Sequence, residues 1–135
     1  RTTSRQVYRG VGAGRGRGAY DGKVLIRHGA AKASSEQSSR NLLLSPHAEI
    51  DSRPQLEIYT DDVKAGHGAT TGALDENMLF YLLSRGLDRA TARGVLTFAF
   101  AEDVVAQVRI PALRRVLEKR VLQGLPDADL IREFV

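Results

Sequence analysis

The feature that most constrains the fold of this 135-residue chain is a change of sequence pattern near Gly72. Before that glycine the segments are short, β-like and separated by glycine and proline, and no connecting segment has a helical pattern. After it, apolar residues recur at the spacing of an amphipathic helix. We therefore predict a β portion over residues 1–72 and a helical domain over residues 73–135. Many short strands without intervening helices are typical of a sandwich, a barrel or a β-solenoid.

Two segments of the first half show how its strands are expected to be buried. Residues 41–45 form a mainly apolar run closed by proline, which is typical of a strand covered on both faces. Residues 55–60 alternate in polarity, so Leu56 and Ile58 are predicted to point inward. A serine cluster in residues 34–39 lacks a Gly-x-Ser-x-Gly elbow, so it predicts a solvated or interior polar strip and no nucleophile.

The first helix of the second half has recognisable ends. Asp75 is a good N-cap, and Gly86 suits the position just past the last helical residue. The sequence between them is so apolar that we predict a buried helix.

Three further helices are predicted downstream. Asp88 is suited to cap the second, and Pro111 is suited to the first turn of the third. Gly124 and Pro126 are expected to end the third helix. Asp127 is predicted to cap a short terminal helix that runs through Phe134.

Composition limits the chemistry and the compartment. The chain has no cysteine, so it has no disulfide, no thiolate nucleophile and no thiolate metal site of its own, which favours a cytoplasmic protein. No apolar run approaches the roughly 20 residues needed to cross a bilayer, so we predict no membrane association. The sequence begins with arginine rather than methionine, so we treat it as part of a longer protein.

Positive charge is concentrated at the start of the chain, although the net charge is only +4. The glycine-rich segment 10–18 contains Arg15 and Arg17, but its glycines have neither dinucleotide-binding nor P-loop spacing. We interpret it as a mobile hairpin loop. An RNA-contacting segment is the alternative, although the segment lacks interleaved aromatic residues on which bases would stack.

His67 is the most conspicuous candidate for a functional residue. It lies between two glycines at what the sequence predicts to be a strand-to-helix junction, which suits a presented side chain or a turn. His28 and His47 precede it at similar intervals. A solenoid with coils of that length would stack the three imidazoles into a metal site.

Four segments together resemble the SufB/SufD family of iron–sulfur cluster assembly scaffolds. They are residues 40–51, 54–64, 66–70 and 80–86. The pairing of His-Gly-Ala-Thr with Phe-Tyr-Leu-Leu-Ser-Arg-Gly is similar to the SufD branch. The resemblance covers nearly the whole chain and corresponds to the carboxy-terminal third of a family member.

The resemblance implies a fold and a set of partners. The fold would be mainly β with an α-helical tail, in which a right-handed parallel β-helix is followed by a small helical domain. The strands would pair with a SufB-like scaffold, and the helices would dock a SufC-like ABC ATPase. A non-catalytic scaffold of this kind binds no cofactor alone and holds an iron–sulfur cluster transiently in the assembled complex.

The family motif assigns a role to one residue. His67 occupies the position of the histidine that meets a SufB cysteine at the cluster-forming interface, which makes it a cluster-assembly and metal-ligand candidate. Many relatives have cysteine two residues earlier, where this chain has Ala65. Any thiolate ligands would therefore come from SufB, and His67 would be a ligand, a positioning group or a structural residue.

The helical half contains the docking candidates for the ATPase. Phe98 and Phe100 fall off the main apolar stripe of their helix, so they either form a partner-binding patch or widen the buried face. Arg114 and Arg115 lie opposite the apolar stripe of the next helix. A truncated solenoid would also expose unpaired backbone at its amino-terminal end, so we expect the chain alone to form a homodimer or to be capped in another way. The alternative function is a basic Gly/Arg-looped nucleic-acid-binding module.

Overall fold

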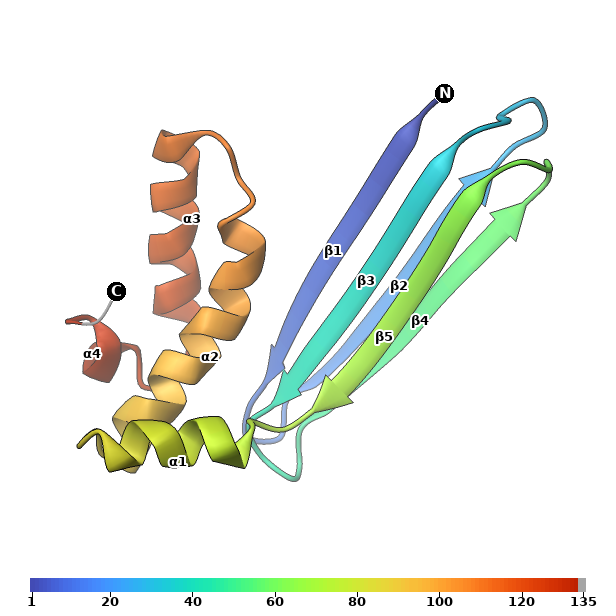
Figure 1. The fold of residues 1–135 in the computed structure, drawn as a ribbon. Coiled ribbons are helices and arrows are strands. Elements are labelled where there is room, and N and C mark those ends of the chain that lie inside the picture. Colours follow the sequence, from blue (N-terminus) through green and yellow to red (C-terminus); the bar gives the residue numbers. More distant parts are fainter. Residues whose placement is uncertain (134–135) are drawn as a thin grey trace.

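The computed structural model describes residues 1–133 and contains five strands followed by four helices (Figure 1). The strands are β1 (Thr3–Gly12), β2 (Arg17–Ile26), β3 (Ser34–Leu43), β4 (Glu49–Ile58) and β5 (Lys64–Gly72). The helices are α1 (Glu76–Ser84), α2 (Arg89–Val105), α3 (Pro111–Gly124) and α4 (Ala128–Ile131). The change from strands to helices thus lies between the end of β5 and the start of α1.

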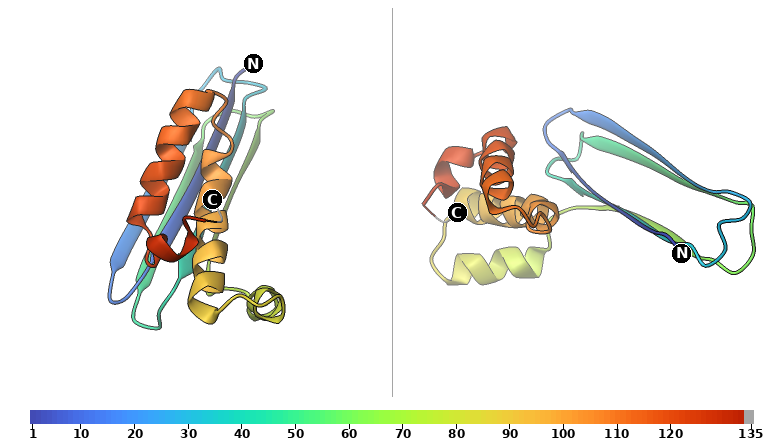
Figure 2. Two further views of the ribbon diagram at one scale, coloured as in Figure 1. Left: turned by 90° about the vertical axis from the view of Figure 1, so that its left-hand side faces the viewer. Right: turned by 90° about the horizontal axis from the view of Figure 1, so that it is seen from above.

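The strands form two parallel sheets that face each other (Figure 2). One has the order β1-β3-β5 and the other pairs β2 with β4, so the chain alternates between the sheets. Gln6 of β1 lies opposite Gln37 of β3, 31 residues further along the chain, and Asn41 of β3 lies opposite Thr71 of β5. The described strands do not close into a barrel, so that alternative is wrong.

The space between the sheets is apolar at one end and polar along much of β3. Val24, Ile26 and Ala33 form the buried apolar cluster, and Leu56 and Ala65 pack against it. Burial follows from the alternation of β-strand side chains, because every second residue points between the sheets.

The polar part of this interior comes from four alternate residues of β3, Ser35, Gln37, Ser39 and Asn41, all of which are buried. Two of them bond to Ser52 of β4 in the facing sheet: the Ser39 and Ser52 hydroxyls lie 3.1 Å apart, and Asn41 Nδ2 donates to Ser52 Oγ at 2.8 Å. Ser35 Oγ, Gln37 Oε1 and Asn41 Oδ1 have no hydrogen-bond partner among the described residues. Half of the predicted serine strip is therefore interior, because Ser35 and Ser39 share the inward parity.

The burial predicted for Ile58 is wrong. Its side chain has the same parity as that of its buried partner Ile26, yet it is 44% exposed. Edge position does not explain this, because both strands of the two-stranded sheet are edges. Ile58 is the last residue of β4, and the exposure is confined to that end, since Leu56 two residues earlier is better covered. Leu56 is half-buried, as the alternation predicts.

Helix α1 has the predicted ends but not the predicted burial. Asp75 accepts hydrogen bonds from the backbone N–H groups of Asn77 and Met78, and Gly86 ends the helix with φ +94°. Only Leu79 of this helix is buried, whereas Phe80 is 71% exposed. The prediction of a buried helix from its apolar composition is therefore wrong. Helix α2 packs against one face of α1, and the other faces remain uncovered within the described chain.

The remaining helices begin where predicted, but the last lacks its predicted cap. Asp88 caps α2, and Pro111 is the first residue of α3. Asp127 adopts a left-handed backbone with φ +59° and forms no side-chain cap, so its predicted role is wrong. Phe134, the predicted end of this helix, lies outside the described residues.

Helix α4 packs on α2 through a close approach at a glycine. A Cβ built on Gly94 would lie 2.6 Å from Ile131 Cγ2, so only glycine allows this contact. Ile131 is fully buried there. None of the helices in residues 1–133 combines the length and the apolar character needed to cross a membrane.

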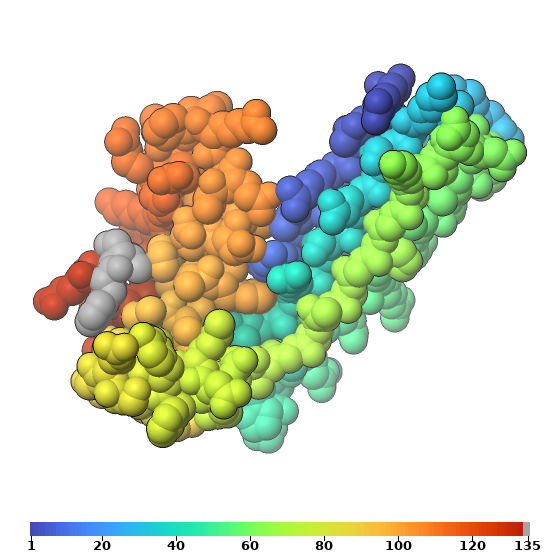
Figure 3. Space-filling view, viewed as in Figure 1, coloured from blue at the N-terminus to red at the C-terminus, as the bar shows by residue number. Residues whose placement is uncertain are grey.

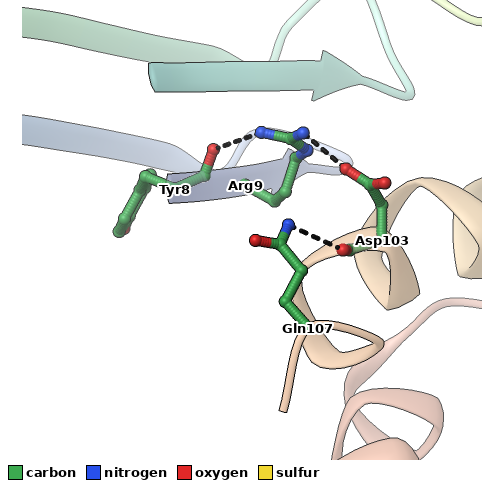
Figure 4. Close-up of polar contacts among 4 residues, drawn as sticks. All are labelled: Tyr8, Arg9, Asp103 and Gln107. Atoms are coloured by element: carbon green, nitrogen blue, oxygen red, sulfur yellow. Dashed lines mark hydrogen bonds and ion pairs between the residues drawn. The ribbon is translucent and has the colours of Figure 1, made fainter. Parts of the chain in front are cut away.

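The helices contact the strands near the carboxyl ends of β1, β3 and β5 and diverge from them toward the amino ends (Figure 3). Arg9 of β1 makes the main polar link: its guanidinium donates to Asp103 of α2 at 2.5 Å and to the Tyr8 carbonyl at 3.1 Å (Figure 4). Arg93 of α2 adds a bond to the Leu44 carbonyl at 2.9 Å. These contacts fix α2 against the sheet.

Candidate functional site

His67 lies within strand β5, not at a junction between strand and helix. Two neighbours of the same parity show the direction of its side chain. Ala65 packs against the apolar cluster between the sheets, and Thr71 accepts a hydrogen bond from buried Asn41 at 3.2 Å. Because side chains alternate along a strand, His67 also points to the side on which the two sheets face each other. The predicted junction is wrong, since the strand continues to Gly72.

The space around His67 is open although the residue faces inward. Strand β5 is the edge of its sheet, and the facing sheet ends at β4. His67 is exposed. Gly66 and Gly68 have the outward parity, and a Cβ built on either would meet no atom within 4 Å, so the outer face of the strand is uncovered as well. No hydrogen bond joins the His67 ring to another group in the described part of the chain. The imidazole is thus presented at the open end of the interior, where a further element would cover it.

The three histidines do not form a stacked metal site. Paired strands repeat at intervals of about 30 residues, as in the 31 residues between Gln6 and Gln37, so the shorter histidine intervals are out of register. His28 lies in the β2–β3 loop beside the Tyr59 ring, and His47 lies in the β3–β4 loop. Within residues 1–133 no three His, Cys, Asp or Glu side chains gather as a potential metal site.

The row that contains His67 is polar across the whole sheet. Gln6 of β1, Gln37 of β3 and His67 of β5 lie directly opposite one another. Gln37 Nε2 donates to Gln6 Oε1 and to the Tyr20 hydroxyl, both at 3.0 Å. The sequence did not indicate this row, because strand register is required to bring three residues so far apart side by side.

The docking candidates lie on two different parts of the helical surface. Phe98 and Arg115 line one groove between α2 and α3, together with Glu118. Arg114 is on the same helix and pairs with Glu118 at 3.0 Å. Phe100 instead faces the strands, where the Arg9 guanidinium lies 5.8 Å from its ring centroid. The structure therefore groups Phe98 with the arginines and separates Phe100 from them.

The glycine-rich segment near the amino end is not a hairpin. Strands β1 and β2 belong to different sheets, so the loop between them is a turn from one sheet to the other. Gly10 and Gly12 belong to β1, where an added Cβ would lie 2.6 Å from Asn41 Oδ1 and 3.2 Å from Ala48 Cβ, respectively. Their lack of side chains is explained by packing, and no nucleotide cradle is needed to account for them.

Several basic residues on the outer faces of the strands form ion pairs with acidic residues of the adjacent strand in the same sheet. Arg5 meets Glu36 at 3.5 Å, and Arg17 meets Glu49 at 3.1 Å. Lys23 donates to Glu57 at 2.5 Å, and this hydrogen bond is the main reason that its pKa is raised. Such exposed pairs add little stability. They nevertheless place an acid beside each of these bases, which weakens the case for a phosphate-binding surface.

Comparison with known proteins assigns the class. Residues 1–100 match the family model of the SUF system iron–sulfur cluster assembly SufBD core domain. The chain therefore belongs to the SufBD family. Within that family it falls in the SufD branch: it is 37% identical over 123 residues to the iron–sulfur cluster assembly protein SufD of Escherichia coli. It is 40% identical over 106 residues to SufD of Bacillus subtilis.

A chloroplast relative, Protein ABCI7 of Arabidopsis thaliana, is 39% identical over 106 residues. These alignments cover 91%, 76% and 78% of the chain for the E. coli, B. subtilis and Arabidopsis proteins, respectively. They cover only 29%, 24% and 22% of the relatives. The chain thus spans less than a third of the curated relatives that it matches.

Proposed function

We propose that this chain is the carboxy-terminal part of a SufD-like, non-catalytic scaffold subunit of iron–sulfur cluster assembly in the cytoplasm. Its strands pair with a SufB-type scaffold, and its helices bind a SufC-type ABC ATPase. The cluster is cargo that forms transiently in the assembled complex, and the chain alone holds no cofactor. Membership of the SufBD family and the position of His67 support this proposal.

The arrangement of strands is consistent with a portion of a right-handed parallel β-helix. All three strand pairs are parallel, and successive strands alternate between two facing sheets. In such a stack, the interior residues of one coil are covered by the next coil. At the last coil no further coil covers them. The interior beyond β5 and β4 is open, and we assign the closing surface to the SufB-type subunit.

The observation that carries the functional proposal is the presentation of His67 at this open end. The imidazole points between the sheets but is exposed, so a subunit seated against β5 would enclose it. A neutral imidazole is a good ligand for iron. The chain has no cysteine, so the thiolates that an iron–sulfur cluster requires come from outside it. We assign them to the SufB-type partner, with His67 as the ligand or positioning group supplied by this chain.

We assign ATPase binding to the helices because they expose apolar side chains. Met78, Phe80 and Tyr81 of α1 are more than half exposed, as are Ile110 before α3 and Val116 within it. A separate groove is lined by Phe98 of α2 and Arg115 of α3. Several exposed apolar side chains on one helix, as on α1, are typical of protein interaction sites.

The test is cluster reconstitution on the complex of the chain with SufB-type and SufC-type partners. Wild type is compared with His67→Ala and with the matched control His47→Ala, which removes a loop histidine outside the strands. We expect all three complexes to assemble and the ATPase to coelute after nuclease treatment. Only His67→Ala is expected to lose most of the cluster, measured by absorbance and by bound iron and sulfide.

Full cluster yield from an intact His67→Ala complex would show that His67 has no part in assembly. Loss of pairing in that variant would make the residue structural and move the search for ligands to the partner. Copurifying nucleic acid with a steep salt dependence would instead favour the nucleic-acid-binding alternative. No observation in the described residues favours that alternative over the scaffold.

A further inference from the structure

A cleft of about 310 Å³ lies where the helices meet the carboxyl ends of β3 and β5. Met78 of α1 and Leu96 and Phe100 of α2 line its helical side, and Arg40 of β3 and Thr70 of β5 line its strand side. A mainly apolar cavity of this size with a few polar groups, placed between two parts of a fold, is the usual form of a small-molecule site.

The strand side of this cleft contains one more positive charge than the neighbouring residues balance. Arg40 lies directly opposite Arg9 of the adjacent strand, so both side chains leave the same face of the sheet. Like charges placed side by side in a sheet are unfavourable. Asp103 of α2 pairs with Arg9 (Figure 4). Arg40 has no ion-pair or hydrogen-bond partner among residues 1–133.

Other exposed arginines of the chain are also unpaired, so the missing partner alone does not indicate a site. Arg40 differs because it combines a neighbouring positive charge with an apolar cleft beside it. Asp75 also lines the cleft, but its Oδ1 accepts hydrogen bonds from the backbone N–H groups of Asn77 and Met78 at the start of α1. The Asp75 charge disfavours a multiply charged anion such as phosphate, so a single carboxylate suits the cleft better.

We propose that the cleft binds a small monocarboxylate with a hydrocarbon body. The carboxylate pairs with the Arg40 guanidinium, whose planar donors match two carboxylate oxygens, and it supplies the negative charge that the two arginines lack. The hydrocarbon body packs on Phe100, Leu96 and Met78, where burial of apolar surface stabilises the complex. The site lies on the outer face of the sheet, opposite to the face from which His67 points. The inference is therefore independent of the proposed assembly function.

The single methionine of the chain makes the test direct. Met78 lines the cleft, so labelling the methionine methyl group with carbon-13 gives one magnetic resonance signal that reports on it. The full chain is titrated with sodium hexanoate and, separately, with 1-hexanol, which has the same hydrocarbon body without the charge. We expect a saturable shift of the Met78 signal with hexanoate and an affinity at least tenfold weaker for hexanol.

A charge-removing variant tests the role of the arginine. Arg40→Gln is expected to weaken hexanoate binding at least tenfold and to leave the response to hexanol unchanged. Arg53→Gln is the matched control, because Arg53 is also an exposed strand arginine but lies in the other sheet. It should retain the wild-type affinity. If circular dichroism shows that Arg40→Gln does not fold, Arg40→Lys is measured instead, with an affinity for hexanoate between the wild-type values for hexanoate and hexanol.

Three results would overturn the proposal. Met78 is itself 59% exposed, so equal responses to hexanoate and hexanol in wild type would indicate adsorption on the apolar surface of α1. A shift that grows with concentration without saturating would show that no defined site exists. An unchanged affinity in Arg40→Gln, or an equal loss in Arg53→Gln, would show that the Arg40 guanidinium does not hold the carboxylate.

Discussion

At the scale of single residues, Asp88 shows how one side chain starts an element. Its carboxylate accepts hydrogen bonds from the backbone N–H groups of Ala90 and Thr91 and from the Thr91 hydroxyl at 2.6 Å. These bonds, that of the Thr91 side chain first, lower the pKa of Asp88 below its ordinary value of 3.8. The ionised carboxylate is thus the form that caps α2.

The pH dependence of stability follows from that direction. Because the pKa of Asp88 is lower in the folded than in the unfolded chain, its contribution is fully present above pH 3.8 and is lost as the pH falls through the folded pKa. We expect Asp88→Asn, which keeps a capping oxygen, to flatten this part of the profile. The measurement is thermal unfolding between pH 2 and 6, compared with wild type. Parallel profiles for the two proteins would contradict the assignment.

At the scale of elements, one ion pair joins the helices to the strands. The Arg9 side chain is only 9% exposed, whereas its partner Asp103 on α2 is 57% exposed. Removing one partner therefore costs a different amount of stability depending on which charge is left without its ion pair. A free Asp103 carboxylate can be hydrated, but a free Arg9 guanidinium remains largely covered.

This asymmetry predicts that Asp103→Ala is more destabilising than Arg9→Met. We expect Asp103→Ala to lower the free energy of unfolding by about 2 kcal/mol, because it leaves a mostly covered charge with one weaker partner. Arg9→Met is expected to cost about 1 kcal/mol, because methionine can still pack on the Phe100 ring. Urea unfolding measures both values. If the two variants lose equal free energy of unfolding, or if Arg9→Met loses more, the burial of the Arg9 charge does not determine the effect of breaking this ion pair.

Helix α1 illustrates a limit of composition at the same scale. Its apolar sequence predicted burial, yet Phe80 and Met78 are exposed while Leu79 is covered. Hydrophobic composition indicates that a surface will be covered by something, but not that the same chain will cover it. The error in the prediction is therefore informative, since it identifies the helical surface assigned above to the ATPase.

At the scale of the whole molecule, the three-stranded sheet has two edges that are unpaired within residues 1–133, β1 and β5, and β5 is the edge beside the open interior at His67. Such edges favour pairing with another chain. We predict that the isolated chain is dimeric at tens of micromolar and that Gly68→Lys makes it monomeric, because lysine on an edge strand opposes edge pairing. An added side chain has room there, with no atom within 4 Å of the new Cβ.

Sedimentation velocity distinguishes the two states. The matched control is Gly124→Lys, which adds the same charge at an equally open position at the end of α3. It should leave the dimer intact. A monomeric wild type, or dissociation by both lysine variants, would rule out association through β5.

The sequence by itself determined the properties that depend on neighbouring residues. Periodicity located the change from strands to helices near Gly72, and capping chemistry identified Asp75, Asp88 and Pro111 as helix starts. The His-Gly-Ala-Thr motif identified the family and the candidate His67. All of these signals are local, because caps, turns and amphipathic periods are set within a few residues.

Tertiary structure alone decided which distant residues meet and which surfaces stay open. The repeat of about 30 residues brought Gln6, Gln37 and His67 into one row and excluded a three-histidine site. It also placed His67 inside β5 and left α1 exposed. These features depend on strand register and on contacts between elements, and a one-residue change of register would turn every interior side chain outward. A short stretch of sequence does not show which residue of a distant strand it will lie opposite.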